Sequence, residues 1–101
     1  MKQLETGTLS QDKKAEIHSK IGFYYWQNGE IELAIKHFEE AIKQDDRQAQ
    51  TWANLGANYL AAGQYTEAIK ALEAALKIKA DLEFSDRIKQ RLYWLKKITV
   101  N

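Results

Sequence analysis

The stretch that decides the fold is TWANLGANYLAAGQYTEAIKALEAALK, residues 51–77. It holds two runs of apolar residues at helical spacing with a break at AAGQY, which predicts two helices joined by a short turn. Gly56 lies in the middle of the first run, where glycine costs a helix about 1 kcal/mol relative to alanine. Such a cost is tolerable where the missing side chain lets a partner helix approach closely. Gly63 lies at the break and suits the left-handed conformation that commonly ends a helix.

The preceding segment, residues 15–48, carries the same pattern. When it is laid over residues 49–82, small and aromatic residues coincide: Gly22 with Gly56, Tyr25 with Tyr59, Gly29 with Gly63, Ala34 with Ala68, Ile35 with Ile69 and Ala41 with Ala75. Apolar character persists where identity does not, as in Ile21 with Leu55, Phe38 with Leu72 and Ile42 with Leu76. A period of about 34 residues with two helices in each unit is typical of one class of helical repeat protein.

These repeated residues also predict how the helices pack. We expect Gly22 and Gly56 to allow close crossings, with the small residues of each second helix opposite them: Ala34, Ala41, Ala68 and Ala75. Trp52, Leu55 and Tyr59 would supply the bulk around those crossings. On the first helix, one apolar face is formed by Ile17, Ile21, Tyr24 and Tyr25.

The second unit resembles the tetratricopeptide repeat, whose pattern is a Trp, a Leu-Gly pair, a Tyr, an Ala and a terminal Pro. The first unit is similar, with His18 where the Trp would stand. The resemblance covers residues 15–82, although Asp46 and Ala80 replace the terminal prolines. It implies an all-α fold, a helical solenoid of two antiparallel helix pairs plus one capping helix.

The chain divides into four parts on this reading. Residues 1–10 form a flexible lead-in that ends at Ser10, a helix N-cap. Residues 11–48 and 49–82 are the two repeats, and residues 83–101 are the capping helix and tail. Altogether the sequence predicts five helices of about three to four turns each, joined by short turns.

The last helix does not continue the register of the two repeats, because that register puts polar residues in the core. A shift of one residue places Ile88 and Leu92 inside, in a stripe that begins at Phe84 and runs on to Leu95. The helix would then close the second repeat and leave three lysines in water: Lys89, Lys96 and Lys97. Tyr93, Trp94 and Val100 leave apolar surface that a simple cap does not explain.

Composition narrows the possible functions. A chain of 101 residues is one domain, and its formal charge of +1 gives no basic field for nucleic acid. It has no cysteine, no apolar run of membrane-spanning length, and no signal-peptide pattern at its start. A soluble, intracellular, cytoplasmic chain is expected, and the soluble part of a membrane-anchored protein is the alternative.

No catalytic or metal-binding pattern stands out. His18 is expected to face the core with one hydrogen-bond partner, and His37 to lie on a solvated surface. The two are not at i, i+4 spacing, and no third ligand accompanies them, so we expect no metal. Asp45 and Asp46 are expected to cap the next helix. Neither an enzyme activity nor a cofactor is predicted.

The resemblance points instead to a binding groove. In the tetratricopeptide family, partner peptides lie along a stripe next to the packed face of each first helix. In this chain the stripe holds Glu16, Ser19, Phe23 and Trp26, then Gln50, Ala53, Ala57 and Leu60, so Ala53 and Ala57 would form a shallow floor. The candidate site residues are Ser19, Phe23, Trp26, Asn54, Ala57, Arg87 and Arg91. The two arginines would lie at the groove edge and pair with Glu83 or with an acidic ligand.

The same resemblance argues against one kind of ligand. One subfamily holds C-terminal carboxylates with a set of Lys and Asn residues, of which only Asn54 is matched. Ser19, Phe23, Phe84 and Ile88 stand at other positions of that set, so the clamp is absent.

The sequence therefore predicts a non-catalytic protein-interaction module, an adaptor, scaffold or assembly factor whose partner is a protein or peptide. Neither nucleic acid nor membrane insertion is expected. Phe23 and Trp26 could instead be covered by the N-terminal segment or by a second copy of the chain. The alternative function is thus a self-association module, in which Trp26 or Trp94 mediates a homodimer.

Overall fold

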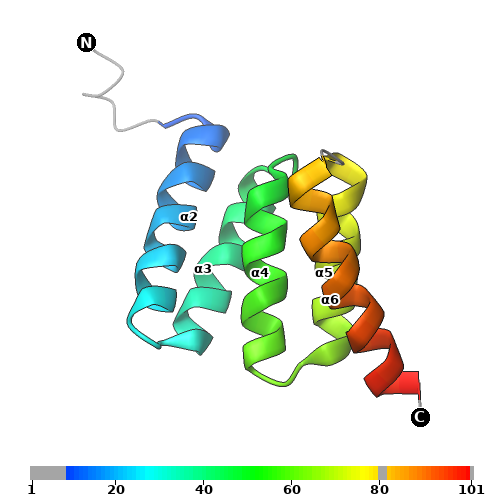
Figure 1. The fold of residues 1–101 in the computed structure, drawn as a ribbon. Coiled ribbons are helices and arrows are strands. Elements are labelled where there is room, and N and C mark those ends of the chain that lie inside the picture. The colour runs from blue at the N-terminus through cyan, green and yellow to red at the C-terminus, as the bar shows by residue number, and fades with distance from the viewer. Residues whose placement is uncertain (1–8, 80–81, 101) are drawn as a thin grey trace.

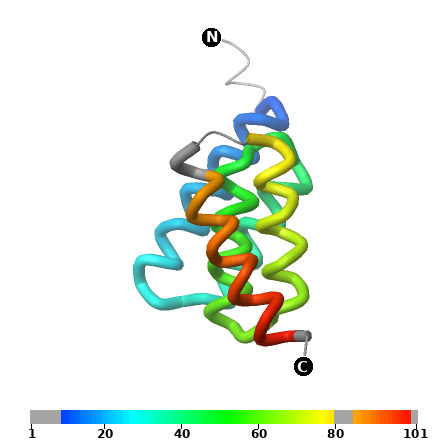
Figure 2. Tube along the Cα trace, turned by 45° about the vertical axis from the view of Figure 1, so that its right-hand side comes forward, coloured from blue at the N-terminus to red at the C-terminus, as the bar shows by residue number. Residues whose placement is uncertain are grey.

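The computed structural model describes residues 9–79 and 82–100, and in the second range it describes the side chains of residues 85–99. The described residues form five helices: α2 (Gln11–Gln27), α3 (Ile31–Gln44), α4 (Ala49–Ala61), α5 (Tyr65–Ile78) and α6 (Leu82–Val100). Helices α2, α4 and α6 lie side by side in one layer, and α3 and α5 lie behind them (Figures 1 and 2). The all-α fold of two antiparallel helix pairs plus one further helix is confirmed. The expected lead-in lies outside the described residues, apart from Leu9 and Ser10.

The helix ends follow the local signals in the sequence. Ser10 is the N-cap of α2, and its hydroxyl accepts a hydrogen bond from the Lys13 amide at 3.3 Å. Gly29 and Gly63 end α2 and α4 with a φ of 78° each, the left-handed conformation expected of them. In both turns the residue after the glycine donates a backbone hydrogen bond to a carbonyl in the last turn of the helix. The Glu30 N–H donates to the Tyr25 carbonyl at 2.9 Å, and the Gln64 N–H donates to the Tyr59 carbonyl at 2.8 Å. The two turns are therefore built alike, one full repeat apart.

Glycine makes the closest crossing in each helix pair. A Cβ atom on Gly56 would lie 2.7 Å from Cδ2 of Leu72, and one on Gly22 would lie 3.0 Å from Cδ1 of Phe38. The crossings are as close as predicted, and the carbonyl oxygen of Ala68, one of the expected partners, lies 3.4 Å from the Cβ position of Gly56. The nearest partner at each crossing, however, is not an alanine. Each glycine faces a large side chain of the second helix, which needs the space that a Cβ would fill. The alanines are instead buried around this contact, as in the case of Ala34 and Ala68.

The core consists of two clusters that meet at α4. One joins α3, α4 and α5, and its buried members are Ala34, Ile35, Phe38, Leu55 and Ala71. The other joins α5 and α6, and its buried members are Ala68, Leu72, Ala75, Ile88, Leu92 and Leu95. Trp52 and Tyr59 pack against both clusters while remaining half-buried. The Trp52 indole N–H also donates to the Asp46 carbonyl at 2.9 Å, so this side chain ties the α3–α4 loop to the core.

The far side of α2 differs from the prediction. Ile17 and Tyr24, expected on the packing face, are exposed, and Tyr24 has 62% of its surface accessible. The buried residues of α2 are Ala15 and Gly22. The reason is the position of α2 at the end of its layer, where no described helix packs on its outer side (Figure 1).

Helix α6 takes the third place in the first layer, next to α4 (Figure 2). Helix α6 begins at Leu82, which is 33 residues after Ala49, the first residue of α4. This step is one residue shorter than the repeat of about 34 residues. Ile88, Leu92 and Leu95 are buried, which confirms the one-residue shift of register. The three predicted surface lysines are exposed, and Lys96 pairs with Glu73 of α5 at 2.9 Å.

Two residues of the predicted α6 stripe and tail, Phe84 and Val100, lie outside the residues whose side chains are described. Among the described residues, no helix is long and apolar enough to cross a membrane.

Replacing Gly56 by Leu should destabilise the fold by about 1–3 kcal/mol, because overpacking against Leu72 outweighs the better helix propensity of leucine. Ala57→Leu is the matched control, one residue further along α4 at a half-buried position. Urea unfolding of both variants measures the difference. A Gly56→Leu protein as stable as the Ala57→Leu protein would show that the glycine is not needed for close approach.

Removing the Trp52 side chain should cost about 3–5 kcal/mol, because an aromatic that packs against both clusters leaves a cavity. Trp94→Ala is the control, since Trp94 is 61% exposed and its loss should change stability by about 0.5 kcal/mol or less. Thermal and urea unfolding of the two variants make the comparison. Equal effects would mean that Trp52 does not join the clusters.

Candidate binding surface

The outer face of the first layer, formed by α2, α4 and α6, is the candidate binding surface. A depression of about 420 Å³ lies between α2 and α4 on this face. It is lined by Asp12, Ala15, Glu16, Ser19, Lys20, Asp45, Gln48, Gln50, Thr51 and Asn54. Two of the predicted site residues, Ser19 and Asn54, therefore line a common hollow.

Phe23 and Trp26 form an exposed aromatic pair on α2. Each is 43% exposed, and their ring centroids are 5.3 Å apart with the ring planes at 37°. Ser19 lies one turn before Phe23, and its hydroxyl is 3.0 Å from that of Thr51 on α4. This bond fixes the flank of α2 that carries Ser19 and Trp26 toward α4, because residues at i and i+7 share one side of a helix. The aromatic pair therefore borders the α2–α4 seam at its C-terminal end.

On α4, the predicted floor is only partly available. Asn54 and Ala57 are half-buried, and the Asn54 side-chain oxygen accepts a hydrogen bond from Gln50 at 3.1 Å. Ala53, expected on this floor, and Leu60, expected in the same stripe, pack against the α5–α6 cluster instead. That part of the prediction was wrong because α6 lies beside α4 and covers their side of the helix.

A buried amide lies beneath this face of α4. Asn58 is 1% exposed, and its side-chain N–H donates to the Asn54 carbonyl at 2.9 Å. Its side-chain oxygen is buried with no hydrogen-bond partner among the described residues. An unpaired buried oxygen is unfavourable, so Asn58 lowers the stability of the fold at this position of α4.

Arg87 and Arg91 are exposed on α6. Lys96 pairs with Glu73 of α5, so the side of α6 that carries Lys96 faces α5. By helical spacing, Arg87 and Arg91 lie on the other side of the buried stripe, away from Lys96. Trp94 and Ile98 continue this flank at i+7 and i+11 from Arg87, and both are about 60% exposed. The predicted capping role of this helix did not explain Trp94. The helical spacing of Trp94 from Arg87 predicts that both lie on the same exposed flank of α6.

Charges near the depression are partly paired. Glu16 lies between Lys13 at 3.2 Å and Lys20 at 3.3 Å, so one carboxylate meets two ammonium groups. The hydrogen bonds from these lysines lower the pKa of Glu16. Arg87 and Arg91 add positive charge on the α6 side of the same layer.

The two histidines form a pair that was not predicted from the sequence. His18 of α2 and His37 of α3 are both half-buried, and their Nδ1 atoms are 3.1 Å apart. The prediction of a solvated His37 was wrong, because α2 lies over it and Tyr25 packs near-parallel to its ring at 5.6 Å. Among the described residues, His37 is the hydrogen-bond partner that was expected for His18. Within the described ranges no three His, Asp or Glu side chains are grouped to hold a metal ion.

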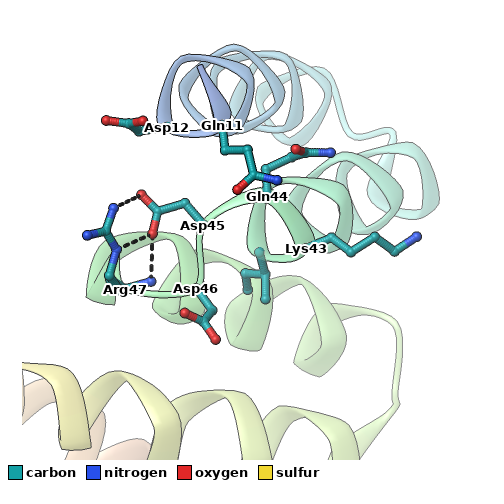
Figure 3. A pocket seen from close by; sticks show the side chains of 8 residues that line it. Gln11, Asp12, Lys43, Gln44, Asp45, Asp46 and Arg47 are labelled. Atoms are coloured by element: carbon teal, nitrogen blue, oxygen red, sulfur yellow. Dashed lines mark hydrogen bonds and ion pairs between the residues drawn. The ribbon is translucent and has the colours of Figure 1, made fainter. Parts of the chain in front are cut away.

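A second depression, of about 320 Å³, lies where the α3–α4 loop meets the start of α2 (Figure 3). Asp45 accepts hydrogen bonds there from the Arg47 amide at 3.1 Å and from its guanidinium at 2.8 and 3.0 Å. These bonds lower the pKa of Asp45 to about 2. The expected helix cap was wrong, since Gln48 is the N-cap of α4 and makes no side-chain cap bond. Asp45 instead stabilises the α3–α4 loop through its hydrogen bonds with Arg47.

Comparisons with known proteins agree with this architecture. No curated protein matches the sequence. Among solved structures, the fold is similar to the first TPR of Spaghetti (RPAP3), bound to the HSP90 peptide SRMEEVD, with a TM-score of 0.55 and 14% sequence identity. The match covers 89% of this chain and 96% of that one.

A family model described as the tetratricopeptide repeat matches residues 13–81, about two-thirds of the chain. The matched range contains both glycine turns and both glycine crossings, and it covers nearly all of the two repeated units. The chain therefore belongs to the tetratricopeptide repeat family.

Proposed function

We propose that this domain is a non-catalytic protein-interaction module that binds a peptide segment of a partner protein on the outer face of its first layer. The family is an interaction fold, which supports this class of function. The observation that carries the proposal is the exposed pair of Phe23 and Trp26. The pair does not line the α2–α4 depression, but follows Ser19, which does, along the same helix. Large exposed aromatics next to a hollow are the usual anchors of protein recognition.

The chemistry of the face suggests what such a peptide contains. Phe23, Trp26 and Ala57 offer an apolar contact toward the C-terminal ends of α2 and α4. Ser19 and Asn54 offer hydrogen-bonding groups closer to the N-terminal ends. Arg87 and Arg91 add positive charge on the α6 side. We infer a ligand with one apolar anchor and an acidic flank, in which the anchor supplies affinity and the charges set orientation.

The similar solved structure supports peptide binding as a class of function, because that protein is bound to a peptide. An identity of 14% supports a shared fold and carries no ligand over to this chain. The set of residues with which one subfamily holds C-terminal carboxylates is matched here at Asn54 alone. We therefore propose an internal peptide segment as the ligand, and the roles of adaptor, scaffold or assembly factor follow from such binding.

Self-association is a second candidate function. Trp94 and Ile98 expose about 60% of their surfaces on one flank of α6, so a second copy could cover them. On this alternative, light scattering should give a mass that falls from dimer to monomer on dilution, and Trp94→Ala should abolish the dimer. A monomer at all concentrations would rule this function out.

The peptide proposal predicts that Trp26→Ala weakens binding by at least about 2 kcal/mol, which corresponds to a rise in Kd of roughly 30-fold. The probe is a peptide selected on the wild-type protein from a random display library, and calorimetry gives its Kd. Stability should change little, because the Trp26 side chain is 43% exposed and lies outside both core clusters.

Tyr24→Ala is the control for this experiment. Tyr24 is also an exposed aromatic of α2, but it lies on the outer side of the helix, so its removal should leave Kd within about twofold. A Trp26→Ala protein that unfolds, or one that binds the selected peptide as well as the Tyr24→Ala protein does, would contradict the assignment of this face.

A further inference from the structure

The contact between His18 and His37 joins α2 to α3 through their imidazole rings. The Nδ1 atoms are 3.1 Å apart, whereas the ring centroids are 5.3 Å apart and the ring planes differ by 27°. The rings therefore meet edge to edge through their nitrogens, in the geometry of a hydrogen bond, and do not stack face to face. In the second repeat, Trp52 and Ala71 occupy the equivalent positions, so this contact is specific to the first helix pair.

The chemistry of such a contact depends on the number of protons that the pair carries. One Nδ1–H must donate and the other Nδ1 must accept through its lone pair, so the accepting ring must be neutral. One additional proton is tolerated, because an imidazolium can donate from Nδ1 to a neutral partner. A second additional proton turns both Nδ1 atoms into donors and places two positive charges in contact. The hydrogen bond is then lost and replaced by repulsion.

The surrounding charges offer little compensation for two cations. Lys14 lies one turn before His18 on α2, and Lys36 and Glu40 flank His37 on α3. Tyr25 packs on His37, and α4 carries no charged residue at all. Among the described residues, Glu40 is the acidic group that favours a charged His37, and it is also coupled to His18. Its carboxylate already receives a hydrogen bond from Gln44 at 3.1 Å and pairs with Lys43 at 3.7 Å, so it is shared among several groups.

The pKa of His37 moves in the matching direction. Burial lowers it below its ordinary value of 6.5, and the nearby His18 and Lys36 lower it further, while Glu40 opposes them. Folded His37 thus binds a proton less readily than unfolded His37. As the pH falls below about 6.5, the unfolded state takes up more protons, so stability is full above that pH and declines below it.

The consequence falls on α2 because of its place in the fold. Helix α2 packs along α3 and meets α4 at only a few residues, and no described helix covers its outer side. We propose that His18 and His37 form a proton-sensitive latch, which holds α2 against α3 while at least one ring is neutral and releases α2 when both are protonated. Since Phe23 and Trp26 lie on α2, release would also remove the aromatic anchor, a consequence that rests on the proposed function.

The latch can be tested without any partner. In the full 15N-labelled chain, long-range imidazole spectra follow both histidines from pH 8 to pH 4, and the chain has only these two. Two coupled steps are expected, with the second proton bound at least about tenfold more weakly than the first. In His37→Gln the single remaining ring should titrate in one step. Two independent wild-type titrations of equal affinity would overturn the proposal.

Hydrogen exchange tests the release itself, after correction for the intrinsic pH dependence of exchange. Between pH 7.5 and pH 5, protection of α2 amides should fall at least about tenfold more than that of α5 amides, which serve as the internal control. His18→Trp places the residue of the second repeat at this position and should abolish the difference. His37→Gln should do the same if the tryptophan variant does not fold. Equal loss of protection in α2 and α5 of the wild type would contradict a latch, whatever the outcome of the peptide-binding experiment.

Discussion

The fold depends on a single kind of contact, a large side chain of each second helix lying on a glycine of the first. Leu72 is 1% exposed and sits where a Cβ of Gly56 would be, so α5 can approach the backbone of α4. That approach buries Ala68 and Ala75 completely and creates the apolar surface on which α6 packs. The distance between the two layers, and with it the placement of the three first-layer helices, follows from this contact. A side chain at Gly56 would therefore disturb the candidate binding surface without touching it.

Local and periodic features were predictable from the sequence, and contacts between distant residues were less so. The repeat period, the two glycine turns, the Ser10 cap and the shifted register of α6 all come from patterns within one helix or one repeat. The side chains nearest to Gly22 and Gly56 could not be predicted in this way. Phe38 and Leu72 lie on the same helical face as the alanines, and a periodic pattern does not tell which residue of a face lies nearest to the glycine. The exposure of Tyr24 depends on the absence of a neighbouring helix, which an apolar stripe does not reveal.

The candidate site shows the same division. Helical spacing was enough to expect an exposed Phe23 and Trp26 on one flank of α2, next to Ser19. It could not foresee that α6 would cover Ala53 and Leu60, since that depends on how α6 packs beside α4. The histidine pair escaped notice for a related reason, because its members are far apart in the sequence and their proximity arises only when α2 and α3 cross. The roles of Arg87 and Arg91 remain predictions.

The likeness of the two turns has a consequence for how such a chain can grow. Both turns place glycine at the same φ and return an amide to the same carbonyl position, and α4 ends one full repeat after α2. An in-frame gene duplication of one unit at the boundary between residues 48 and 49 would thus repeat every glycine crossing in phase and lengthen the array. Such an insertion leaves residues 49–100 in their present order, so α6 keeps its step from α4, one residue shorter than the repeat, and still packs on α5. The array can thus lengthen before residue 49 without any change to the surface on which α6 packs.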